Sequence, residues 1–402
     1  MAITDKKTGV WGLDQTYNKI NQGSIWNYSG SPAFYTWGDN EIKGLGQGQP
    51  NNSNLSSPVQ LSGSTWSSTL RKMAGGYRGA SVIKTDGTLW AWGYASYGEG
   101  GHDNTTQYNS PVQVGSDTTW AAIGRGYEFM MATKTDGTLW ASGRNYHGQI
   151  GQNESGSSMP GGYYSSPKQI PGTTWKTTPR GFNAHYHGTA AIRTDGTLWT
   201  WGMNQYVGAL GQNNTTNYSS PKQVHGGGTD WDKCIKSLQN RTGAIKTDGT
   251  LWVWGTNSSG CLGLNDQAGR SSPTQVGSDT TWNVVCTNRS STVAVKTDGT
   301  LWVWGNSSSG KLGNNTGPGN NRSSPIQIPG TTWNDCNVGY DQSYATKTDG
   351  TLWGWGDNES GELAQNNVTA YSSPVQIPGN WPIAPTGGYD AAGNNIMGIK
   401  EL

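Results

Sequence analysis

Short runs of hydrophobic residues, separated by turn residues, make up most of this chain. Apolar and β-branched runs such as "SVIK", "GAIK" and "VAVK" precede the pair Asp-Gly, and "TLWxWG" follows it. Asp-Gly between two extended runs predicts a two-residue hairpin turn, because both residues tolerate positive φ. No hydrophobic period of 3.6 residues runs through these segments. The pattern therefore predicts pairs of short antiparallel strands.

The heptapeptide "KTDGTLW" recurs about every fifty residues, a spacing typical of repeat folds. Its copies begin at Lys84, Lys134, Arg193 (with Arg in place of Lys), Lys246, Lys296 and Lys347. If the Asp of each copy were catalytic, the chain would hold six identical sites with no base or nucleophile beside them. We therefore interpret the heptapeptide as a structural joint that each repeat needs.

A second marker, "SP-x-Q", occurs seven times, and a Trp follows each copy. The marker prolines are Pro58, Pro111, Pro167, Pro221, Pro273, Pro325 and Pro374, and the Trp residues are Trp66, Trp120, Trp175, Trp231, Trp282, Trp333 and Trp381. Each unit thus contains four short strands: strand a ("SPVQV"), strand b (from the marker Trp), strand c ("GAIK") and strand d ("TLWxWG"). Seven such units predict a seven-bladed β-propeller.

The two ends of the repeat region predict how the ring closes. The chain enters at a d strand near residues 34–37 and leaves at a c strand near residues 397–400. Pairing these strands would close the ring and remove two free sheet edges. The predicted fold is all-β: a seven-bladed propeller of four-stranded blades over residues 31–402, closed by the N- and C-terminal strands, with a short extension over residues 1–30.

Composition and charge argue against several classes of function. Among 402 residues there are 61 Gly and 21 Trp, and the net charge is +1. This balance does not indicate a nucleic-acid partner. No apolar run has the length of a membrane span, and the first residues lack a secretion signal core. The four Cys form no CxxC pair and are predicted to be buried apolar side chains. We expect no membrane insertion, no cofactor and no metal site.

Strand order predicts two faces. Adjacent strands are antiparallel, so the short, nearly constant a–b and c–d turns share one face, and the variable b–c and d–a loops share the other. The b–c loops present Tyr77, Arg78, Arg125, Tyr127, Phe129, Phe182, His185, Tyr186, His187, Arg241, Arg289, Tyr340 and Tyr344. The d–a loops add Tyr94, Tyr97, His102, Tyr146, His147, Tyr163, Tyr164, Tyr206 and Tyr371. Variable loops rich in Tyr and Arg on a constant frame predict a binding surface.

The sequence signals for catalysis or metal binding are weaker than the signal for a binding surface. The sequence has no G-x-S-x-G motif, no Walker loop and no Cys/His pair at a recognised spacing. His185 and His187 have no third ligand nearby, so we interpret them as solvated rather than metal-binding. An enzyme would need carboxylates that converge, and Glu128, Asp341 and Asp390 belong to separate repeats. We therefore expect that the protein is not an enzyme.

The segments after strand d carry a family resemblance. "WGDNESGELAQN", "WGNSSSGKLGNN" and "WGTNSSGCLGLN" resemble the regulator of chromosome condensation repeat, and the likeness extends over about residues 31–402. That family includes an exchange factor for a small GTPase, ubiquitin-ligase modules and a bacterial β-lactamase inhibitor. The resemblance implies a platform that binds other proteins, since one fold supports many functions.

Residues 1–30 match no blade. A short helix is plausible over residues 13–21, and the segment carries candidate anchor residues. These are Trp11, Leu13, Tyr17, Ile20 and Trp26. "GVWGLDQTYNK" resembles the openings of virion proteins of tailed phages, especially cyanophages. One alternative is a strap across the propeller's own surface.

Taken with the propeller, this resemblance predicts a non-enzymatic phage virion protein of the tail, fibre or capsid, assembled in host cytoplasm. Residues 1–30 would dock on other virion proteins, and the loop face would bind a host surface protein or glycan. The alternative is a cellular protein-binding module, inhibitor or scaffold of the condensation-regulator type.

Overall fold

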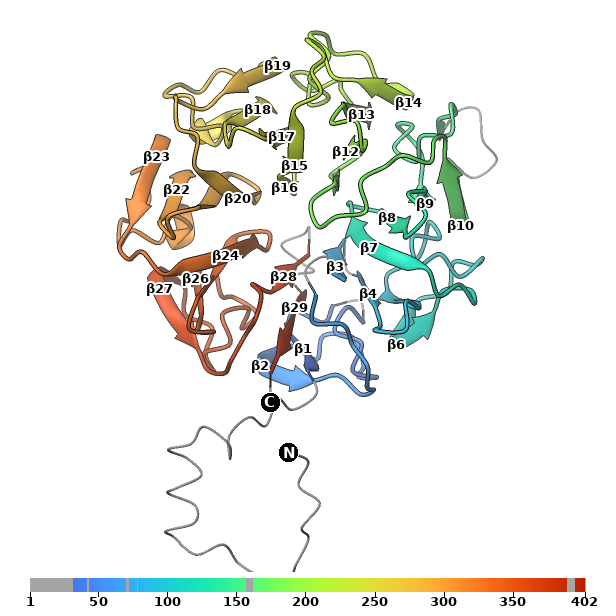
Figure 1. Cartoon of the computed structure of the whole chain (residues 1–402). Helices are drawn as coiled ribbons and strands as arrows, with labels where there is room; N and C mark the ends of the chain where they lie inside the picture. The colour runs from blue at the N-terminus through green and yellow to red at the C-terminus, as the bar shows by residue number, and fades with distance from the viewer. Residues whose placement is uncertain are drawn as a thin grey trace, which may run out of the picture.

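A computed structural model describes residues 32–41, 43–69, 72–77, 79–156, 162–388 and 395–401. Within these ranges, seven sheets stand around a common axis as the blades of a ring (Figure 1). The predicted all-β, seven-bladed propeller is confirmed. The segment 1–30 and its candidate anchor residues lie outside the described residues, so the division into a docking segment and a propeller stays a prediction. No helix in the described part of the chain is long and apolar enough to cross a membrane.

Six blades follow one another along the chain. Blade 1 consists of β3 (Met73–Gly76), β4 (Gly79–Ile83), β5 (Leu89–Gly93) and β6 (Tyr108–Gln113). Blade 2 consists of β7 (Trp120–Arg125), β8 (Phe129–Lys134), β9 (Leu139–Arg144) and β10 (Tyr163–Ile170). Blade 3 consists of β11 (Phe182–His185), β12 (Gly188–Ile192), β13 (Leu198–Gly202) and β14 (Tyr218–Gln223).

The next three blades repeat this order. Blade 4 consists of β15 (Trp231–Cys234), β17 (Arg241–Lys246), β18 (Leu251–Gly255) and β19 (Arg270–Gln275). Blade 5 consists of β20 (Trp282–Thr287), β21 (Ser291–Lys296), β22 (Leu301–Gly305) and β23 (Arg322–Ile328). Blade 6 consists of β24 (Trp333–Val338), β25 (Gln342–Lys347), β26 (Leu352–Gly356) and β27 (Tyr371–Ile377). Short 3-10 helices, Ser258–Gly260 and Ser308–Gly310, follow β18 and β22.

Each blade runs from the axis to the rim in the order b, c, d, a. In blade 2, for example, β7, β8, β9 and β10 are neighbours in that order and antiparallel, and Figure 1 shows β7 toward the axis and β10 at the rim. The outer strand a therefore belongs to the SP-x-Q marker that follows the blade's own heptapeptide.

The seventh blade closes the ring as predicted. It consists of β28 (Thr386–Gly387), β29 (Asn395–Lys400), β1 (Ala33–Gly38) and β2 (Leu55–Gln60). β1 pairs antiparallel with β29 along its whole length, from the pair Ala33 and Lys400 to the pair Gly38 and Asn395. The two ends of the propeller thus share one sheet, and neither leaves an open edge.

One sheet departs from the four-strand pattern. In blade 4 the innermost strand is interrupted, and β16 (Lys236–Ser237) pairs in parallel with β20 of blade 5. The sheet of blade 5 therefore has five strands. The exchange ties blades 4 and 5 together at the axis.

The heptapeptide is a structural joint, and its fourth copy shows why each residue is needed. The Lys246 ammonium lies 4.9 Å from the ring centre of Trp231 and 4.7 Å from that of Trp252. Such a cation–π contact is worth about 0.5–2 kcal/mol. Asp248 Oδ1 accepts hydrogen bonds from the backbone N–H (2.9 Å) and hydroxyl (2.7 Å) of Thr250, whose Oγ1 accepts one from Trp252 Nε1 at 2.9 Å.

The turn itself is one residue longer than the predicted two-residue turn. Gly249 N–H donates to the Lys246 carbonyl at 3.0 Å, and Lys246 N–H donates to the Thr250 carbonyl at 3.0 Å. Three residues therefore lie in the loop, and only Gly249 has positive φ, at 80°. The prediction of a two-residue turn was wrong because the Asp side chain bonds forward to Thr250, which favours a type I turn followed by a left-handed Gly.

The Gly of the turn also joins neighbouring blades. The Gly249 carbonyl accepts a hydrogen bond from Trp282 N–H of blade 5 at 3.2 Å. Equivalent bonds of 2.8–3.2 Å link Gly87, Gly137, Gly196, Gly299 and Gly350 to the first Trp of the next blade. The heptapeptide thus recurs in successive blades because its residues make contacts both within a blade and between blades.

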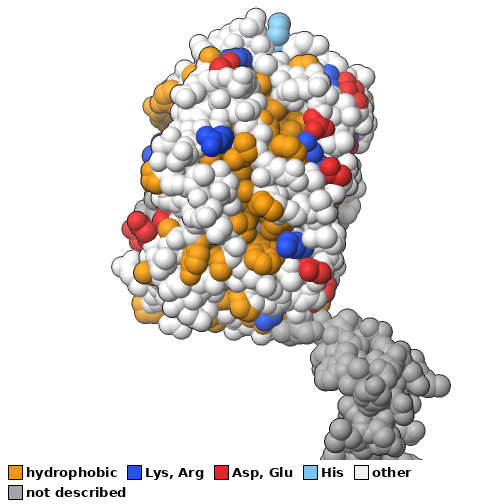
Figure 2. Space-filling view, turned by 90° about the vertical axis from the view of Figure 1, so that its left-hand side faces the viewer, with side chains coloured by type: hydrophobic (Ala, Val, Ile, Leu, Met, Phe, Trp, Pro, Cys, Tyr) orange, Lys and Arg blue, Asp and Glu red, His pale blue; other side chains and the backbone are white. Residues whose placement is uncertain are grey.

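The rim of the ring carries hydrophobic side chains on the side where β23 and β27 lie. Figure 2 views the molecule from that side and shows hydrophobic side chains gathered in a broken band, with charged side chains along it. All seven outer strands contain the Pro of the SP-x-Q marker. Because Pro has no N–H, it reduces the ability of these edge strands to pair with another strand.

Candidate functional site

The b–c and d–a loops lie on the same face, as predicted from the antiparallel strand order. Arg144, at the end of β9, makes an ion pair with Glu128 in the b–c loop of the same blade. Its guanidinium also lies 4.9 Å from the ring centre of Tyr97, in the d–a loop of blade 1. We call this surface the loop face.

Hydrogen bonds between neighbouring b–c loops order the centre of the loop face. Tyr77 N–H donates to the Tyr127 carbonyl, and Tyr127 N–H donates to the Tyr186 carbonyl, each at 3.2 Å. On the far side of the ring, Arg289 N–H donates to the Tyr340 carbonyl at 3.2 Å. The loops therefore support one another around the axis, although their sequences differ.

The structure brings several predicted binding residues into one aromatic cluster. Ring centres lie 4.2 Å apart for Tyr77 and Tyr127, 4.8 Å for Tyr127 and Tyr186, and 4.2 Å for Tyr186 and His187. His147, from the d–a loop of blade 2, continues the cluster at 5.0 Å from His187. We call Tyr77, Tyr127, Tyr186, His187 and His147 the aromatic sector.

The aromatic sector reaches across the axis. Tyr77 and Tyr127 come from blades 1 and 2, yet both pack against a core cluster of blades 5 and 6 that includes Leu238 and Val338. Their side chains are half-buried, as is that of Tyr186. The aromatic sector thus exposes part of its ring surface to solvent, while residues of several blades pack against the rings.

Most of the remaining predicted binding residues are buried in the frame, and so is His187 of the aromatic sector. Seven side chains are buried: those of Arg125, Phe129, Phe182, His185, His187, Arg241 and Tyr344. Tyr344, for example, donates its hydroxyl hydrogen to the Glu362 carbonyl at 2.8 Å inside blade 6. Arg289 is exposed and Tyr340 is half-buried. Arg78 lies outside the described residues. No ligand identifies a binding residue, so the assignment of this set stays a prediction.

Arg125 takes the place of a missing Trp. In six blades the second Trp of strand d donates its Nε1 hydrogen to a d–a loop carbonyl of the preceding blade, at 2.7–3.0 Å. Blade 2 has Ser142 at this position. Instead, Arg125 Nη2 donates to the corresponding carbonyl, that of Glu99, at 3.3 Å. In the sequence, "LWASG" showed that the second Trp of strand d is missing from this repeat. It did not show which residue takes the place of that Trp.

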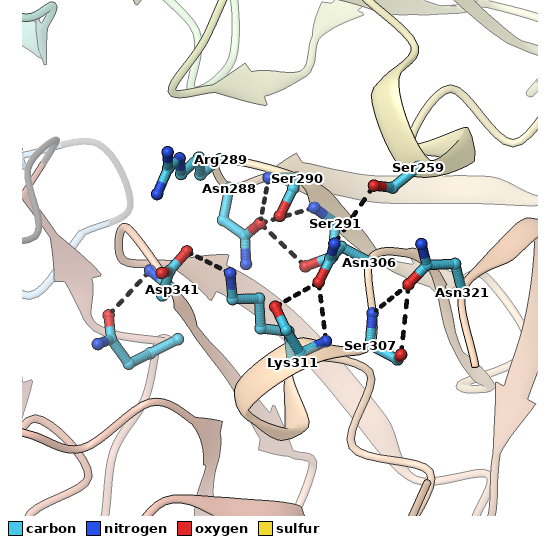
Figure 3. A network of polar contacts seen from close by, with 12 residues as sticks. Ser259, Asn288, Arg289, Ser290, Ser291, Asn306, Ser307, Lys311, Asn321 and Asp341 are labelled. Carbon is cyan, nitrogen blue, oxygen red and sulfur yellow. Dashed lines mark hydrogen bonds and ion pairs between the residues drawn. The ribbon is translucent and has the colours of Figure 1, made fainter. Parts of the chain in front are cut away.

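The opposite sector of the loop face is polar, and Figure 3 shows its network. Asn288 Oδ1 accepts hydrogen bonds from Ser291 N–H at 2.8 Å and from the Ser291 hydroxyl at 2.9 Å. Lys311, buried in the d–a loop of blade 5, makes an ion pair of 2.8 Å with Asp341 in the b–c loop of blade 6. These side chains bond mainly to one another, which fixes the loops of blades 5 and 6.

His185 and His187 are buried, so the interpretation of both as solvated was wrong. Burial lowers the pKa of His185 and of His187 to about 3, so both imidazoles are neutral near pH 7. In the described ranges, no group of three or more His, Cys, Asp or Glu side chains is arranged to hold a metal ion. Glu128 pairs with Arg144 and Asp341 pairs with Lys311, while Asp390 lies outside the described residues.

Two buried carboxyl groups in the d–a loops give a pH prediction. Burial raises the pKa of Glu99 and of Glu362 to about 7. Between pH 4.5 and 7 the folded state then binds more protons than the unfolded state, so stability falls as pH rises through this window. We expect Glu99→Gln to be more stable than wild type at pH 8 by on the order of 3 kcal/mol and nearly equal to it at pH 4.5.

Urea unfolding of wild type and Glu99→Gln at several pH values measures this difference. Gln149 occupies the equivalent loop position in blade 2, so the substituted side chain suits the site. The exposed residue Glu401 provides a control for the substitution itself, since Glu401→Gln leaves both buried carboxyl groups of the d–a loops in place. A constant offset between Glu99→Gln and wild type from pH 4.5 to 8 would contradict the prediction.

Among the described residues, the axis of the propeller holds two hollows, and the larger, of about 280 Å³, lies at the start of the inner strands, where Lys233, Asn283 and Asn334 line it. A cavity of about 30 Å³ lies among the inner strands, and that is space for one or two water molecules. Arg180 Nη2 pairs with Asp335 at 3.0 Å, and Lys236 Nζ donates to Thr386 Oγ1 at 2.6 Å. All four cysteines are buried, as predicted.

Comparison with known proteins agrees with the repeat assignment. Residues 195–236, 248–295 and 298–345 match the model of the regulator of chromosome condensation (RCC1) repeat. The ultraviolet-B receptor UVR8 of Arabidopsis thaliana is 25% identical over 195 residues, which cover 46% of this chain and 43% of the receptor. A protein RCC2 homolog of Danio rerio is 36% identical over 76 residues, 19% of this chain and 15% of the homolog. Each match spans less than half of the relative's length.

Solved structures show the same fold at low sequence identity. Prp20p from Saccharomyces cerevisiae, whose binding to Gsp1p and histones has been studied, has a TM-score of 0.78 at 15% identity, with 92% of each chain covered. The same yeast protein bound to Kap60 has a TM-score of 0.76 at 15% identity, with 100% of this chain and 96% of that chain covered. The chain is therefore a β-propeller, and three of its segments between residues 195 and 345 match the regulator of chromosome condensation repeat.

Proposed function

We propose that this protein is a binding module for another protein and that the loop face is its contact surface. The observation that carries the proposal is the aromatic sector, where Tyr77, Tyr127 and Tyr186 stack side by side and stay half-buried. Tyr side chains supply large contact areas at a low cost in conformational entropy, so they dominate many protein interfaces.

Two further observations support a protein partner. The loops of the face are bonded to one another, so the surface is ordered before a partner arrives, which lowers the free-energy cost of binding. The yeast propeller of the same fold binds proteins, namely Gsp1p, histones and Kap60. At 15% identity this likeness supports the class of partner and not its identity.

Substitutions in the aromatic sector should weaken such binding. We expect the double variant Tyr127→Ala and Tyr186→Ala to bind a protein partner roughly tenfold or more weakly, because truncated interface aromatics commonly cost 1–4 kcal/mol. A partner recovered with wild-type bait from the source cells would be purified and its Kd measured by calorimetry.

A matched control comes from the opposite face. Asp248→Asn, in an exposed c–d turn, should keep wild-type affinity and nearly wild-type stability, because Asn suits the same turn. Melting curves establish that both variants are folded. Binding lost with Asp248→Asn and kept with the double variant would place the interface on the other face.

The finer hypothesis of a phage virion protein rests on the sequence resemblance of residues 1–30. In that hypothesis the segment docks on other virion proteins, and the loop face binds a host surface protein or glycan. Location in a virion remains a proposal. Mass spectrometry of purified particles tests it directly, and absence of the chain from particles of its source would reject it.

A further inference from the structure

A groove crosses the rim between blades 5 and 6. It has a volume of about 540 Å³, within the range of small-molecule sites. Trp333, Trp353 and Lys347 of blade 6 form one part of its lining, and the d–a loop and the outer strand β23 of blade 5 contribute Asn314 and Gln327. This groove lies on the side of the ring that Figure 2 presents.

Lys347 carries a charge that the groove does not neutralise. Its ammonium lies 4.8 Å from the ring centre of Trp333 and 4.6 Å from that of Trp353. Among the described residues no carboxylate is within ion-pair distance of it. Asp349, in the same turn, is held by Thr351 through hydrogen bonds of 3.0 and 2.7 Å.

The corresponding groove between blades 1 and 2 supplies the contrast. It has a volume of about 500 Å³ and the same Trp–Lys–Trp arrangement, made by Trp120, Lys134 and Trp140. There, however, Lys134 Nζ lies 2.6 Å from Asp117 Oδ2. The turn before blade 2 is "GSDTTW", whereas the turn before blade 6 is "PGTTW", with Gly330 at the position of Asp117.

We propose that the groove at Lys347 binds a carboxylated saccharide, with the sugar carboxylate paired to the Lys347 ammonium. The apolar C–H face of a sugar ring fits against the half-exposed indole of Trp353, as aromatic rings in polar clefts commonly allow. Asn314, Gln327 and Ser373 supply amide and hydroxyl groups for the sugar hydroxyls.

The edge of the groove argues against an extended acidic peptide. A peptide would add as a strand to β27, and its affinity would come from backbone hydrogen bonds. Pro374 lines the groove in β27 and has no N–H to donate. A compact ligand that uses side-chain amides and one charge fits the lining better.

Calorimetric titration of the full-length protein tests the proposal with glucuronate, glucose and a pentaglutamate peptide as probes. We expect glucuronate to bind at least tenfold more tightly than glucose, and Lys347→Gln to abolish that difference. Near-UV circular dichroism shows whether the variant keeps its tryptophan packing. Glucose and glucuronate binding with equal affinity would overturn the proposal.

A gain-of-function variant keeps the test decisive if Lys347→Gln does not fold. Asp117→Asn retains the oxygen that accepts from Thr119 but releases Lys134 from its ion pair. We expect this variant to bind one equivalent of glucuronate more than wild type. If the number of glucuronate molecules bound did not change, an unpaired Lys would not be what determines binding in these grooves. Pentaglutamate binding as tightly as glucuronate, in a manner that needs Lys347, would instead assign the groove to acidic peptides.

Discussion

Gly249→Ala is expected to destabilise the protein by about 3 kcal/mol or more. Gly249 has a φ of 80°, and an added Cβ would lie 1.9 Å from the Thr280 carbonyl oxygen in the turn that leads to blade 5. Left-handed backbone costs a non-Gly residue about 1–2 kcal/mol, and overpacking typically adds about 1–3 kcal/mol. Equilibrium unfolding in urea, followed by tryptophan fluorescence, measures the loss.

Gly277 offers a matched control for this substitution. Its φ is 58°, but nothing lies within 4 Å of an added Cβ. Gly277→Ala should therefore show the backbone cost alone, about 1–2 kcal/mol. If Gly249→Ala and Gly277→Ala lowered the free energy of unfolding equally, the close contact between blades 4 and 5 would add nothing to the backbone cost. The role assigned to the turn Gly would then be wrong.

Deletion of residues 393–402 is expected to unfold or aggregate the protein. It removes β29, whose Ile396, Met397 and Ile399 are fully buried, and burial of each contributes about 1.5–3 kcal/mol. The sum is comparable with the total stability of a typical domain, about 5–15 kcal/mol. The deletion also exposes β1 as a free edge, a common cause of aggregation. Size-exclusion chromatography and thermal melting report both effects.

Met397→Ala separates the loss of a side chain from the loss of ring closure. This variant keeps every backbone hydrogen bond between β1 and β29, so it should cost about 2–5 kcal/mol and remain monomeric. A deletion variant that melts like Met397→Ala, without aggregating, would show that closure contributes little beyond one buried side chain.

The sequence by itself determined the architecture. The heptapeptide and the SP-x-Q marker repeat at a fixed spacing, so strand number, blade number and the pairing of β1 with β29 followed from local patterns. Strand order also assigned the b–c and d–a loops to one face. These features are encoded locally, because alternating hydrophobic residues and turn residues act within a few positions of the chain.

Only the tertiary structure decided which loop residues are available for binding. His185 and Arg241 belong to the same loops as Tyr186 and Arg289, yet they are buried in the frame. Burial depends on the neighbouring blade, which lies about fifty residues away in the sequence. For the same reason, the sequence could not show that Arg125 takes the place of a Trp, since its hydrogen bond is to the Glu99 carbonyl of the preceding blade.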